Sequence, residues 1–363
     1  MRHGLSFLPD SSASDGRGLP ATEYFAMLMD LSVLADEAGM SHIKITEHYL
    51  QAYGGYCPNP LTFLAGVAGR TKQIRLMTGC LLPVFHHPIQ IASETAMVDA
   101  MSGGRLDVGF ARAYMPYEFD AFGIFMDSSR DRFVATVGAV QRLWTEQRVS
   151  VDTPFFAFEE ATTLPRPVQP AGPPVWIAAV RSAESFQNAG RNGHGLLVTP
   201  SLSPLAEMAN MIEIYRDNYV PRFDGDVPRV LASLPLLVAA TDEQAVAAAD
   251  PLLAHYLQVW AASADAWTRR TSTDYRGYTG MGYAIRSFTP QKLRTVGGAV
   301  VGSVEHVIDR IESIQDILTV DGFLWQVDFG GVQLPAARAN VELFLSCVAP
   351  ALRCFDSRPV AAA

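Results

Sequence analysis

A histidine that directly follows a carboxylate is the first candidate for chemistry in this sequence. His48 comes after Glu47 within the run Thr46-Glu47-His48-Tyr49. Because an imidazole gains and loses a proton near neutral pH, His48 can shuttle a proton or donate a hydrogen bond to a bound ring. The alternative is a structural histidine that is hydrogen-bonded between neighbouring loops. Residue type and position leave both interpretations open.

Three further side chains are suited to hold an anion. Ser182 and Ser185 lie three residues apart at the start of a predicted helix, where hydroxyls, free amides and the helix dipole favour negative charge. Arg112 follows an apolar run, and its guanidinium can clamp a phosphate through two hydrogen bonds. The alternatives are an ordinary cap at Ser182 and an ion pair from Arg112 to Glu47, Glu118 or Asp120. Together the three residues predict a site for a phosphorylated cofactor, which they do not name.

We do not expect a metal site or disulfides. The side chains of the adjacent pair His86-His87 alternate in direction, and no spacing of histidines and carboxylates fits a metal centre. The four cysteines lack a Cys-x-x-Cys spacing and are too sparse to cross-link the chain: Cys57, Cys80, Cys347 and Cys354. This cysteine usage predicts a reducing, cytoplasmic location.

Composition and charge exclude several classes of protein. The chain has 363 residues, of which 49% are hydrophobic and 18% charged, and this balance is typical of a folded globule and not of a disordered chain. A net charge of -9 provides no basic surface for nucleic acid or for an anionic membrane. The start, MRHGLSFLPD, lacks the basic and apolar segments of a signal peptide, and we find no run of about 18 apolar residues that could span a membrane.

Short aliphatic or β-branched runs alternate with longer amphipathic segments, which is the pattern of βα units around a parallel sheet. Eight strands are predicted: 3–7, 42–47, 74–82, 106–111, 175–179, 195–198, 230–239 and 322–329. Eight helices are predicted between and after them: 21–38, 59–70, 88–101, 129–144, 182–191, 205–215, 304–318 and 336–352. We therefore expect a closed (β/α)8 TIM barrel. The alternative, a doubly wound open sheet, usually has a glycine-rich phosphate turn, and this sequence has no GxGxxG.

Two stretches interrupt the repeat. Residues 149–174 are predicted to form a hairpin followed by a proline-rich connector. Residues 241–302 form an insertion between strand 7 and helix 7, which we expect to be a long loop that acts as a lid or a binding element. The insertion is rich in aromatic residues, among them Trp260, Trp267, Tyr275, Tyr278 and Tyr283. We expect residues 1–363 to form a single domain.

The motifs as a set resemble the bacterial luciferase-like family of flavin-dependent monooxygenases, and the resemblance covers nearly the whole chain. It rests on six ordered pieces: Thr46-Glu47-His48-Tyr49; Thr78-Gly79-Cys80-Leu81-Leu82-Pro83 with His87-Pro88; Ser102-Gly103-Gly104-Arg105-Leu106-Asp107-Val108-Gly109 with Arg112 and Glu118-Phe119; Pro173-Pro174-Val175-Trp176-Ile177; Gly193-His194-Gly195; and Gly302-Ser303-Val304-Glu305. The resemblance implies a (β/α)8 barrel and a two-component monooxygenase that receives reduced FMN (FMNH2) from a separate flavin reductase and uses O2 to oxidise a small molecule.

The resemblance also assigns roles to residues. His48 would be the catalytic histidine near the reactive edge of the flavin. The cofactor-binding residues would be Arg112, Ser182 and Ser185 at the FMN phosphate, Val180 and Arg181 in the same loop, and Gly79 and Cys80 at a turn where family members have a non-prolyl cis peptide. Three positions depart from the pattern that many members share: Tyr49 replaces a second histidine, Arg181 an acidic residue, and Ala113 a glycine.

We expect a largely apolar substrate pocket formed by aromatic side chains: Phe7, Tyr49, Tyr114, Tyr283 and Trp325. The alternative is that most of these side chains belong to the core. The pocket would favour an aromatic or polycyclic substrate, which would be hydroxylated or oxidised in a Baeyer–Villiger manner, and we expect such a reaction in secondary metabolism. One alternative function is a deazaflavin-dependent hydride-transfer oxidoreductase, since the same barrel family uses both cofactors. A second alternative is a non-catalytic flavin-binding subunit. The resemblance further implies a homodimer formed through the second and third helices.

Overall fold

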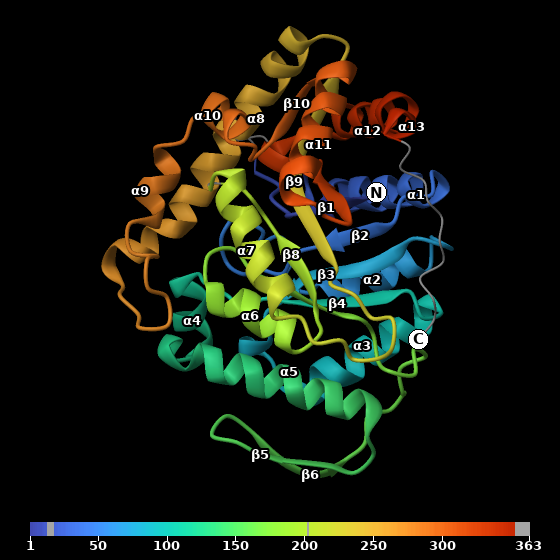
Figure 1. The fold of residues 1–363 in the computed structure, drawn as a ribbon, viewed down its shortest axis with the longest axis vertical. Helices are drawn as coiled ribbons and strands as arrows, with labels where there is room; N and C mark the ends of the chain where they lie inside the picture. The colour runs from blue at the N-terminus through green and yellow to red at the C-terminus, as the bar shows by residue number, and fades with distance from the viewer. Residues whose placement is uncertain (13–17, 202, 353–363) are drawn as a thin grey trace.

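In the part of the chain that the structure describes, eight parallel strands close into a barrel (Figure 1). The computed structural model describes residues 1–12, 18–201 and 203–352. The order of the strands around the ring follows the chain: β1 (Arg2–Phe7), β2 (His42–Ile45), β3 (Arg75–Leu81), β4 (Leu106–Phe110), β7 (Val175–Ala178), β8 (Gly195–Val198), β9 (Val230–Ala239) and β11 (Gly322–Gln326). Parallel pairing of β11 with β1 closes the ring. The predicted TIM barrel is confirmed.

Helices surround the barrel close to where the sequence predicts them: α1 (Ala21–Glu37), α2 (Pro60–Ala68), α3 (Pro88–Ser102), α5 (Ser129–Thr145), α6 (Ala183–Arg191), α7 (Leu205–Asp217), α11 (Val304–Leu318) and α12 (Leu334–Leu343). Local signals set several ends. Asn59 caps α2 by accepting a hydrogen bond from the amide of Thr62, and Ser303 caps α11 in the same way. The sequence analysis missed one short helix, α4 (Pro116–Phe122).

Alternation along the strands separates the helix-facing core from the barrel interior. In β1, Leu5 and Phe7 belong to the core under the helices, whereas Ser6 lies on the inner wall. Within the barrel an apolar layer joins five strands: Met77, Cys80, Trp176, Leu197, Leu231 and Leu324. This layer separates the two ends of the barrel interior, so each end has its own polar environment.

A polar network closes the amino-terminal end of the barrel. Gly103 and Gly104 adopt positive φ values of 67° and 84° after α3, which lets the chain turn sharply into β4. Arg105 then donates hydrogen bonds to backbone carbonyls of neighbouring segments: Ala68, Thr71, Ile74 and Ser102. Asp107 accepts from His42 Nε2 at 3.1 Å and from Arg75 Nε at 2.8 Å. The run from 102 to 109 therefore contributes to the stability of this end, far along the strands from the catalytic end of such barrels.

The predicted hairpin at residues 149–174 is confirmed. Strands β5 (Val149–Asp152) and β6 (Ala157–Ala161) pair in an antiparallel two-stranded sheet. The hairpin projects from the barrel at the bottom of Figure 1.

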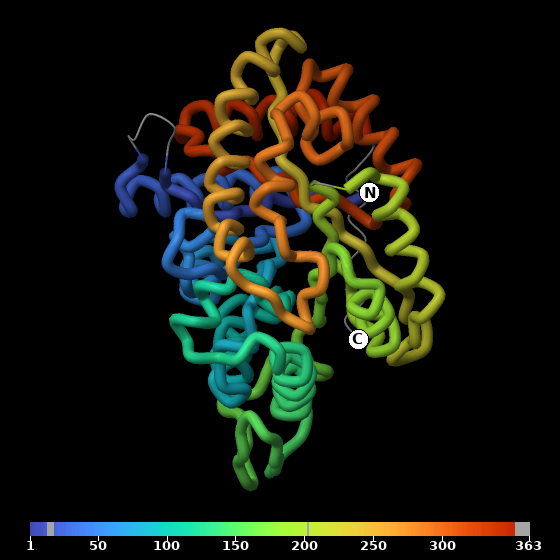
Figure 2. Tube along the Cα trace, turned by 90° about the vertical axis from the view of Figure 1, so that its left-hand side faces the viewer, coloured from blue at the N-terminus to red at the C-terminus, as the bar shows by residue number. Residues whose placement is uncertain are grey.

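The insertion at 241–302 is mainly helical, so the prediction of a long loop is wrong. It contains α8 (Asp242–Ala264), the 3₁₀ segment η3 (Asp265–Arg269), α9 (Met281–Arg286), α10 (Pro290–Thr295) and β10 (Val300–Ser303), which adds to β9. Thr241 caps α8, and an alanine-rich sequence continues it for 23 residues, which outweighs the interior Pro251. The insertion lies at the left of Figure 1 and faces the viewer in Figure 2. Across the described residues, none of the helices has both the length and the apolar character needed to cross a bilayer.

Candidate active site

A cavity of about 650 Å³ lies at the carboxyl ends of the strands, between the barrel and the insertion. Strand-end residues such as Thr46, Ala111 and Ala179 form one wall, and α8 and the segment 273–281 form the other. The cavity brings together most of the predicted site residues: His48, Gly79, Cys80, Arg112, Tyr114, Val180, Arg181, Ser182 and Ser185. This is the end of a TIM barrel at which active sites are built.

His48 lines the cavity and is oriented by a buried carboxylate. Its Nδ1 lies 3.0 Å from Oε1 of Glu118, and the two residues are 5% and 0% exposed. Because a carboxylate only accepts, the contact places a proton on Nδ1, and in the neutral form of the ring Nε2 is then the acceptor. The amide of Tyr49 also donates to Oε1 of Glu118, at 2.9 Å. The structural and the catalytic interpretation of His48 are therefore compatible. The hydrogen bond to Glu118 fixes the position of the imidazole, and the same imidazole lines the cavity.

Glu47, by contrast, holds loops together. It is fully buried and accepts from the amide of Leu82 at 2.9 Å, from His86 Nε2 at 2.6 Å and from the hydroxyl of Tyr49. Burial opposes protonation of His86, but the hydrogen bond and charge of Glu47 outweigh it and raise the pKa of His86. Tyr49 packs against Phe85 and Phe122 and does not line the cavity, so its predicted place in the substrate pocket is wrong.

Arg112 is held by the insertion. Its guanidinium donates to Oδ2 of Asp274 at 3.4 Å and to the backbone carbonyl of Asp274 at 3.0 Å, and it lies 4.2 Å from the ring centroid of Tyr275. The same carboxylate accepts from the amide of Arg130 and from the hydroxyl of Ser129, at the start of α5. The ion-pair partner of Arg112 is therefore Asp274, and not one of the three carboxylates that the sequence suggested: Glu47, Glu118 and Asp120.

The start of α6 is suited to a phosphate. Ser182 is its N-cap residue, yet its hydroxyl makes no capping hydrogen bond, and in the described part of the chain the hydroxyls of Ser182 and Ser185 have no partner. Besides Arg112, three more arginines line the same cavity. Arg130 pairs with Glu184 at 3.0 Å, while Arg181 and Arg276 have no ion pair within the described ranges. Free hydroxyls, a helix start and surplus positive charge fit the phosphate of a flavin mononucleotide. Sequence reasoning missed Arg130 and Arg276, because helix and loop positions give no strand-end signal.

Gly79 and Cys80 lie at the end of β3 and are joined by a cis peptide bond, as members of the resembled family have at this turn. A Cβ atom at position 79 would lie 2.1 Å from Cγ of Lys44, so any other residue there would force the Lys44 side chain to move. Burial raises the pKa of the Cys80 thiol to about 12, so it is a neutral group in the wall of the cavity.

Aromatic side chains cover the cavity on the insertion side. Trp260 Nε1 donates to the hydroxyl of Tyr114 at 3.2 Å, and the Trp260 ring stacks on Tyr53 with centroids 5.7 Å apart. Tyr256 lies one helical turn before Trp260 on α8, and Tyr278 packs beside Tyr114. The sequence analysis did not identify Tyr53 and Tyr256 as lining residues, although the spacing of four between 256 and 260 is a helical signal.

Three other residues predicted for the substrate pocket lie elsewhere. Phe7 and Trp325 are fully buried but face the helices, because their strand neighbours Ser6 and Gln326 take the inward positions. Tyr283 is 78% exposed on α9. None of the three lines the cavity, so this part of the prediction is wrong, and the reason for Phe7 and Trp325 is the parity of the strand.

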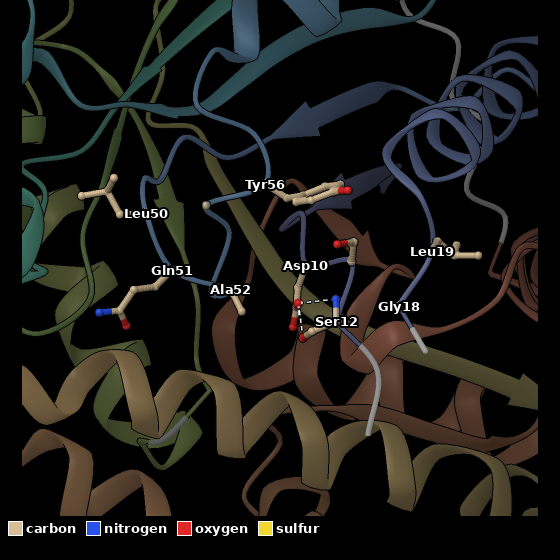
Figure 3. Close-up of a pocket in the computed structure, with 10 residues that line it drawn as sticks. Asp10, Ser12, Gly18, Leu19, Leu50, Gln51, Ala52 and Tyr56 are labelled. Atoms are coloured by element: carbon tan, nitrogen blue, oxygen red, sulfur yellow. Dashed lines mark hydrogen bonds between the residues drawn. The ribbon is translucent and has the colours of Figure 1, made fainter. Parts of the chain in front are cut away.

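A second depression of about 440 Å³ lies near the start of the chain (Figure 3). Its lining includes Asp10, whose Oδ1 accepts from the amide of Ser12 at 2.8 Å, while Leu50, Gln51 and Ala52 lie across from this pair. Ser12 and Gly18 are also among its lining residues, and residues 13–17 between them lie outside the described residues. We assign it no function.

Comparison with known proteins agrees with this geometry. A family model described as luciferase-like monooxygenase matches residues 1–320. The oxygenase component of flavin-dependent trigonelline monooxygenase from Acinetobacter baylyi is 29% identical over 331 residues, which cover 89% of each chain. The F420-dependent glucose-6-phosphate dehydrogenase of Kineococcus radiotolerans is 30% identical over 187 residues, which cover 49% of this chain and 54% of its own.

Solved structures show the same fold along the whole chain. A monooxygenase from Streptomyces bottropensis, RslO1, has a TM-score of 0.83 at 31% identity and covers 97% of this chain and 99% of its own. The oxygenating constituent of 3,6-diketocamphane monooxygenase from Pseudomonas putida, solved with FMN, has a TM-score of 0.78 at 19% identity, with 96% and 98% covered, and shows the fold alone. From the match of its family model and its fold, this chain belongs to the luciferase-like monooxygenase family.

Proposed function

We propose that this protein is the oxygenase component of a two-component flavin-dependent monooxygenase, which takes reduced FMN from a separate reductase and O2 to oxidise an aromatic or polycyclic small molecule. One observation carries the proposal: His48 and the anion-binding groups Arg112, Ser182 and Ser185 line the same cavity. The similarity to the oxygenase component of trigonelline monooxygenase, which extends over 89% of each chain, supports it.

The start of α6 would hold the FMN phosphate. The hydroxyls of Ser182 and Ser185 would donate to phosphate oxygens together with the free amides of the first turn. Arg112 would turn part of its guanidinium from Asp274 to the phosphate, and Arg181, which has no ion pair among the described residues, adds positive charge. Val180 would pack beside the same group.

His48 would act on a proton at the reacting centre. Glu118 holds Nδ1, so Nε2 is the atom that can accept a proton or a hydrogen bond from a molecule in the cavity. When bound, the reduced flavin supplies the electrons for oxygen chemistry, and the protein groups orient the reactants and exclude water.

The aromatic wall supports an apolar substrate. Tyr114, Tyr256 and Trp260 place large faces on the insertion side of the cavity, and Met281 adds a flexible apolar group. Such a wall stacks on planar ring systems and keeps water from the reacting atoms. Hydroxylation and Baeyer–Villiger oxidation are both compatible with these groups.

The experiment that tests this function is binding of reduced cofactors by the purified protein under anaerobic conditions. We expect reduced FMN to bind, and exposure to O2 with a flavin reductase to give oxygen uptake that depends on this protein. The principal competitor is a deazaflavin-dependent hydride transferase, which the similarity to F420-dependent dehydrogenases over about half of the chain favours. Binding of the reduced deazaflavin with no binding of reduced FMN would replace our proposal by this competitor.

We also propose that two copies of the chain associate through α2 and α3. Met97 and Met101 lie four residues apart on one face of α3 and are 50% and 55% exposed, so they give this helix an apolar surface that a second copy could cover. Sedimentation of the wild-type protein should give a dimer, and the double change Met97→Glu and Met101→Glu should give a monomer. A monomeric wild type would exclude this arrangement.

A further inference from the structure

A row of polar side chains crosses adjacent strands at the floor of the cavity. Ser6 on β1 pairs in register with Lys44 on β2 and with Gln326 on β11. Ser233 on β9 lies closer to the amino-terminal end of the barrel, because its register partner on β11 is Leu324, two residues before Gln326. All of them line the cavity, and we call them the floor row: Ser6, Lys44, Ser233 and Gln326.

Lys44 has fewer partners than an amine requires. Its Nζ donates to the hydroxyl of Ser6 at 2.9 Å and to that of Ser233 at 3.4 Å, and within the described part of the chain no carboxylate lies in ion-pair distance. An ammonium has three N–H donors, so one is left for a molecule in the cavity. The residue is only 8% exposed, and burial lowers its pKa, which makes an unpaired charge there costly unless a ligand offsets it.

Gln326 provides a second, independent sign of a missing partner. Its side chain is 6% exposed, lines the cavity, and has a buried Nε2 without any hydrogen-bond partner in the described residues. Buried amide groups in folded proteins almost always have partners, and a half-turn of the Gln326 amide exchanges Nε2 with Oε1, so this residue of the cavity wall can turn an unsatisfied N–H to a ligand.

The surroundings decide which kind of ligand atom fits. The layer below is apolar, with Leu231 and Leu324 beneath Ser233 and Gln326, so it offers no side-chain acceptor. The hydroxyl of Ser233 already donates to Ser6 or to the carbonyl of Leu324, at 3.1 and 3.2 Å. Lys44 Nζ and Gln326 Nε2 are therefore donors left over in the floor row, and the ion pairs of the described residues give Lys44 no carboxylate.

We propose that the floor row is a subsite that binds an anionic or carbonyl oxygen of a molecule held in the cavity. Lys44 and Gln326 would donate to this oxygen from adjacent sides, while the hydroxyls fix the amine. The inference rests on the proposed function and adds to it: the ring system that enters the cavity has an oxygen acceptor at its inner end. That oxygen belongs either to the substrate, as a carboxylate, phenolate or enolate, or to a carbonyl of the flavin ring.

The test compares Lys44→Met and Gln326→Leu with Lys72→Met, which makes the same change at an exposed lysine. Each full-length variant is titrated with 2-naphthoate, with neutral 2-naphthalenemethanol and with reduced FMN. If the oxygen belongs to the substrate, both floor variants should lower the affinity for 2-naphthoate by roughly tenfold or more, which is the effect of losing one charge-assisted hydrogen bond. Their affinities for 2-naphthalenemethanol and for reduced FMN should stay unchanged. If it belongs to the flavin, the loss should appear for reduced FMN.

The inference is overturned if neither floor variant changes the affinity for 2-naphthoate or for reduced FMN relative to Lys72→Met. Gln326→Leu keeps the test decisive if Lys44→Met fails to fold, because the Nε2 it removes has no partner in the protein. Failure of the wild type to bind reduced FMN would instead count against the proposed function, so the two failures are distinguishable.

Discussion

The two ends of the barrel interior treat buried polar groups in opposite ways. At the amino-terminal end, Asp107 accepts from His42 and from two nitrogens of Arg75, at 2.8 to 3.1 Å. At the carboxyl end, Lys44 has only hydroxyl partners and Gln326 keeps an orphaned amide. The apolar layer that contains Leu231 and Leu324 lies between the two ends.

The difference separates a structural network from a binding site. Where donors and acceptors satisfy one another, a buried polar cluster fixes the fold and offers nothing to a ligand. Where donors are left over beside a cavity, the protein retains a desolvation cost that a ligand can relieve. Substitutions at the amino-terminal end should therefore change mainly the free energy of unfolding, and substitutions at the carboxyl end should change mainly ligand binding and turnover.

The largest effect should come from Asp107→Asn. Burial alone would raise the pKa of Asp107, but Arg75 and His42 outweigh it and hold the pKa well below its usual range. Removing this charge leaves a largely buried guanidinium without its counter-ion, which should lower the free energy of unfolding by roughly 3 to 5 kcal/mol. Urea unfolding at pH 7 measures it. Lys44→Met should cost far less, and an equal loss for the two variants would contradict the contrast between the ends.

The second prediction concerns His48, at the cavity end. His48→Ala should lower turnover by roughly 10²-fold, because it removes the proton-accepting Nε2, while binding of reduced FMN stays close to wild type. The matched control is His306→Ala, since His306 is half exposed on α11 and does not line the cavity. Turnover of His48→Ala equal to that of the control would leave His48 a structural residue like His42.

The third prediction concerns Arg112, and it tests whether a cation that already forms an ion pair within the protein can also bind a ligand. Arg112 is paired with Asp274, as Arg75 is with Asp107, yet it lines the cavity. Arg112→Ala should weaken FMN by roughly tenfold to a hundredfold, the effect of losing charge-assisted hydrogen bonds to a phosphate. Asp274→Asn should not weaken FMN, and Arg191→Ala at the far end of α6 is the control. Unchanged FMN affinity in Arg112→Ala would remove it from the proposed phosphate site.

Most of the barrel was predictable because its signals are local. Strand runs, helix caps and the glycines at 103 and 104 each act within a few residues, and all eight predicted barrel strands are present in the described ranges. The structure of the insertion was not predictable in this way, since its aromatic and small residues suit a loop as well as a helix. Its helix α8 is stabilised by packing of Tyr256 and Trp260 against Tyr53 and not by helix propensity alone.

Site residues were predictable where their position at the end of a strand is enough to place them at the cavity. They were not predictable where placement depends on which way a strand side chain points or on a partner far away in the sequence. His48 and Arg112 follow strands directly, so their placement at the cavity needed only the barrel. Phe7 and Trp325 were assigned to the pocket because the inward parity of β1 and β11 is not visible in an apolar run. The Asp274 partner of Arg112 is 162 residues away, and no local pattern indicates such a pair.

The smallest effect tests a carboxylate near the cavity end that forms no ion pair among the described residues. Leu8 and Tyr24 donate to Asp328, and burial raises the pKa of this carboxyl to about 7, the opposite of Asp107. Between pH 4 and pH 7 the folded state then binds more protons than the unfolded state, so stability falls as the pH rises through this window. Asp328→Asn cannot ionise, and its stability relative to wild type should rise by about 2 kcal/mol from pH 5.5 to pH 8. Urea unfolding at both pH values measures the difference in unfolding free energy between Asp328→Asn and wild type. If this difference does not change with pH, Asp328 is ionised in the folded state, as Asp107 is. The two ends of the barrel would then differ only in their hydrogen bonding.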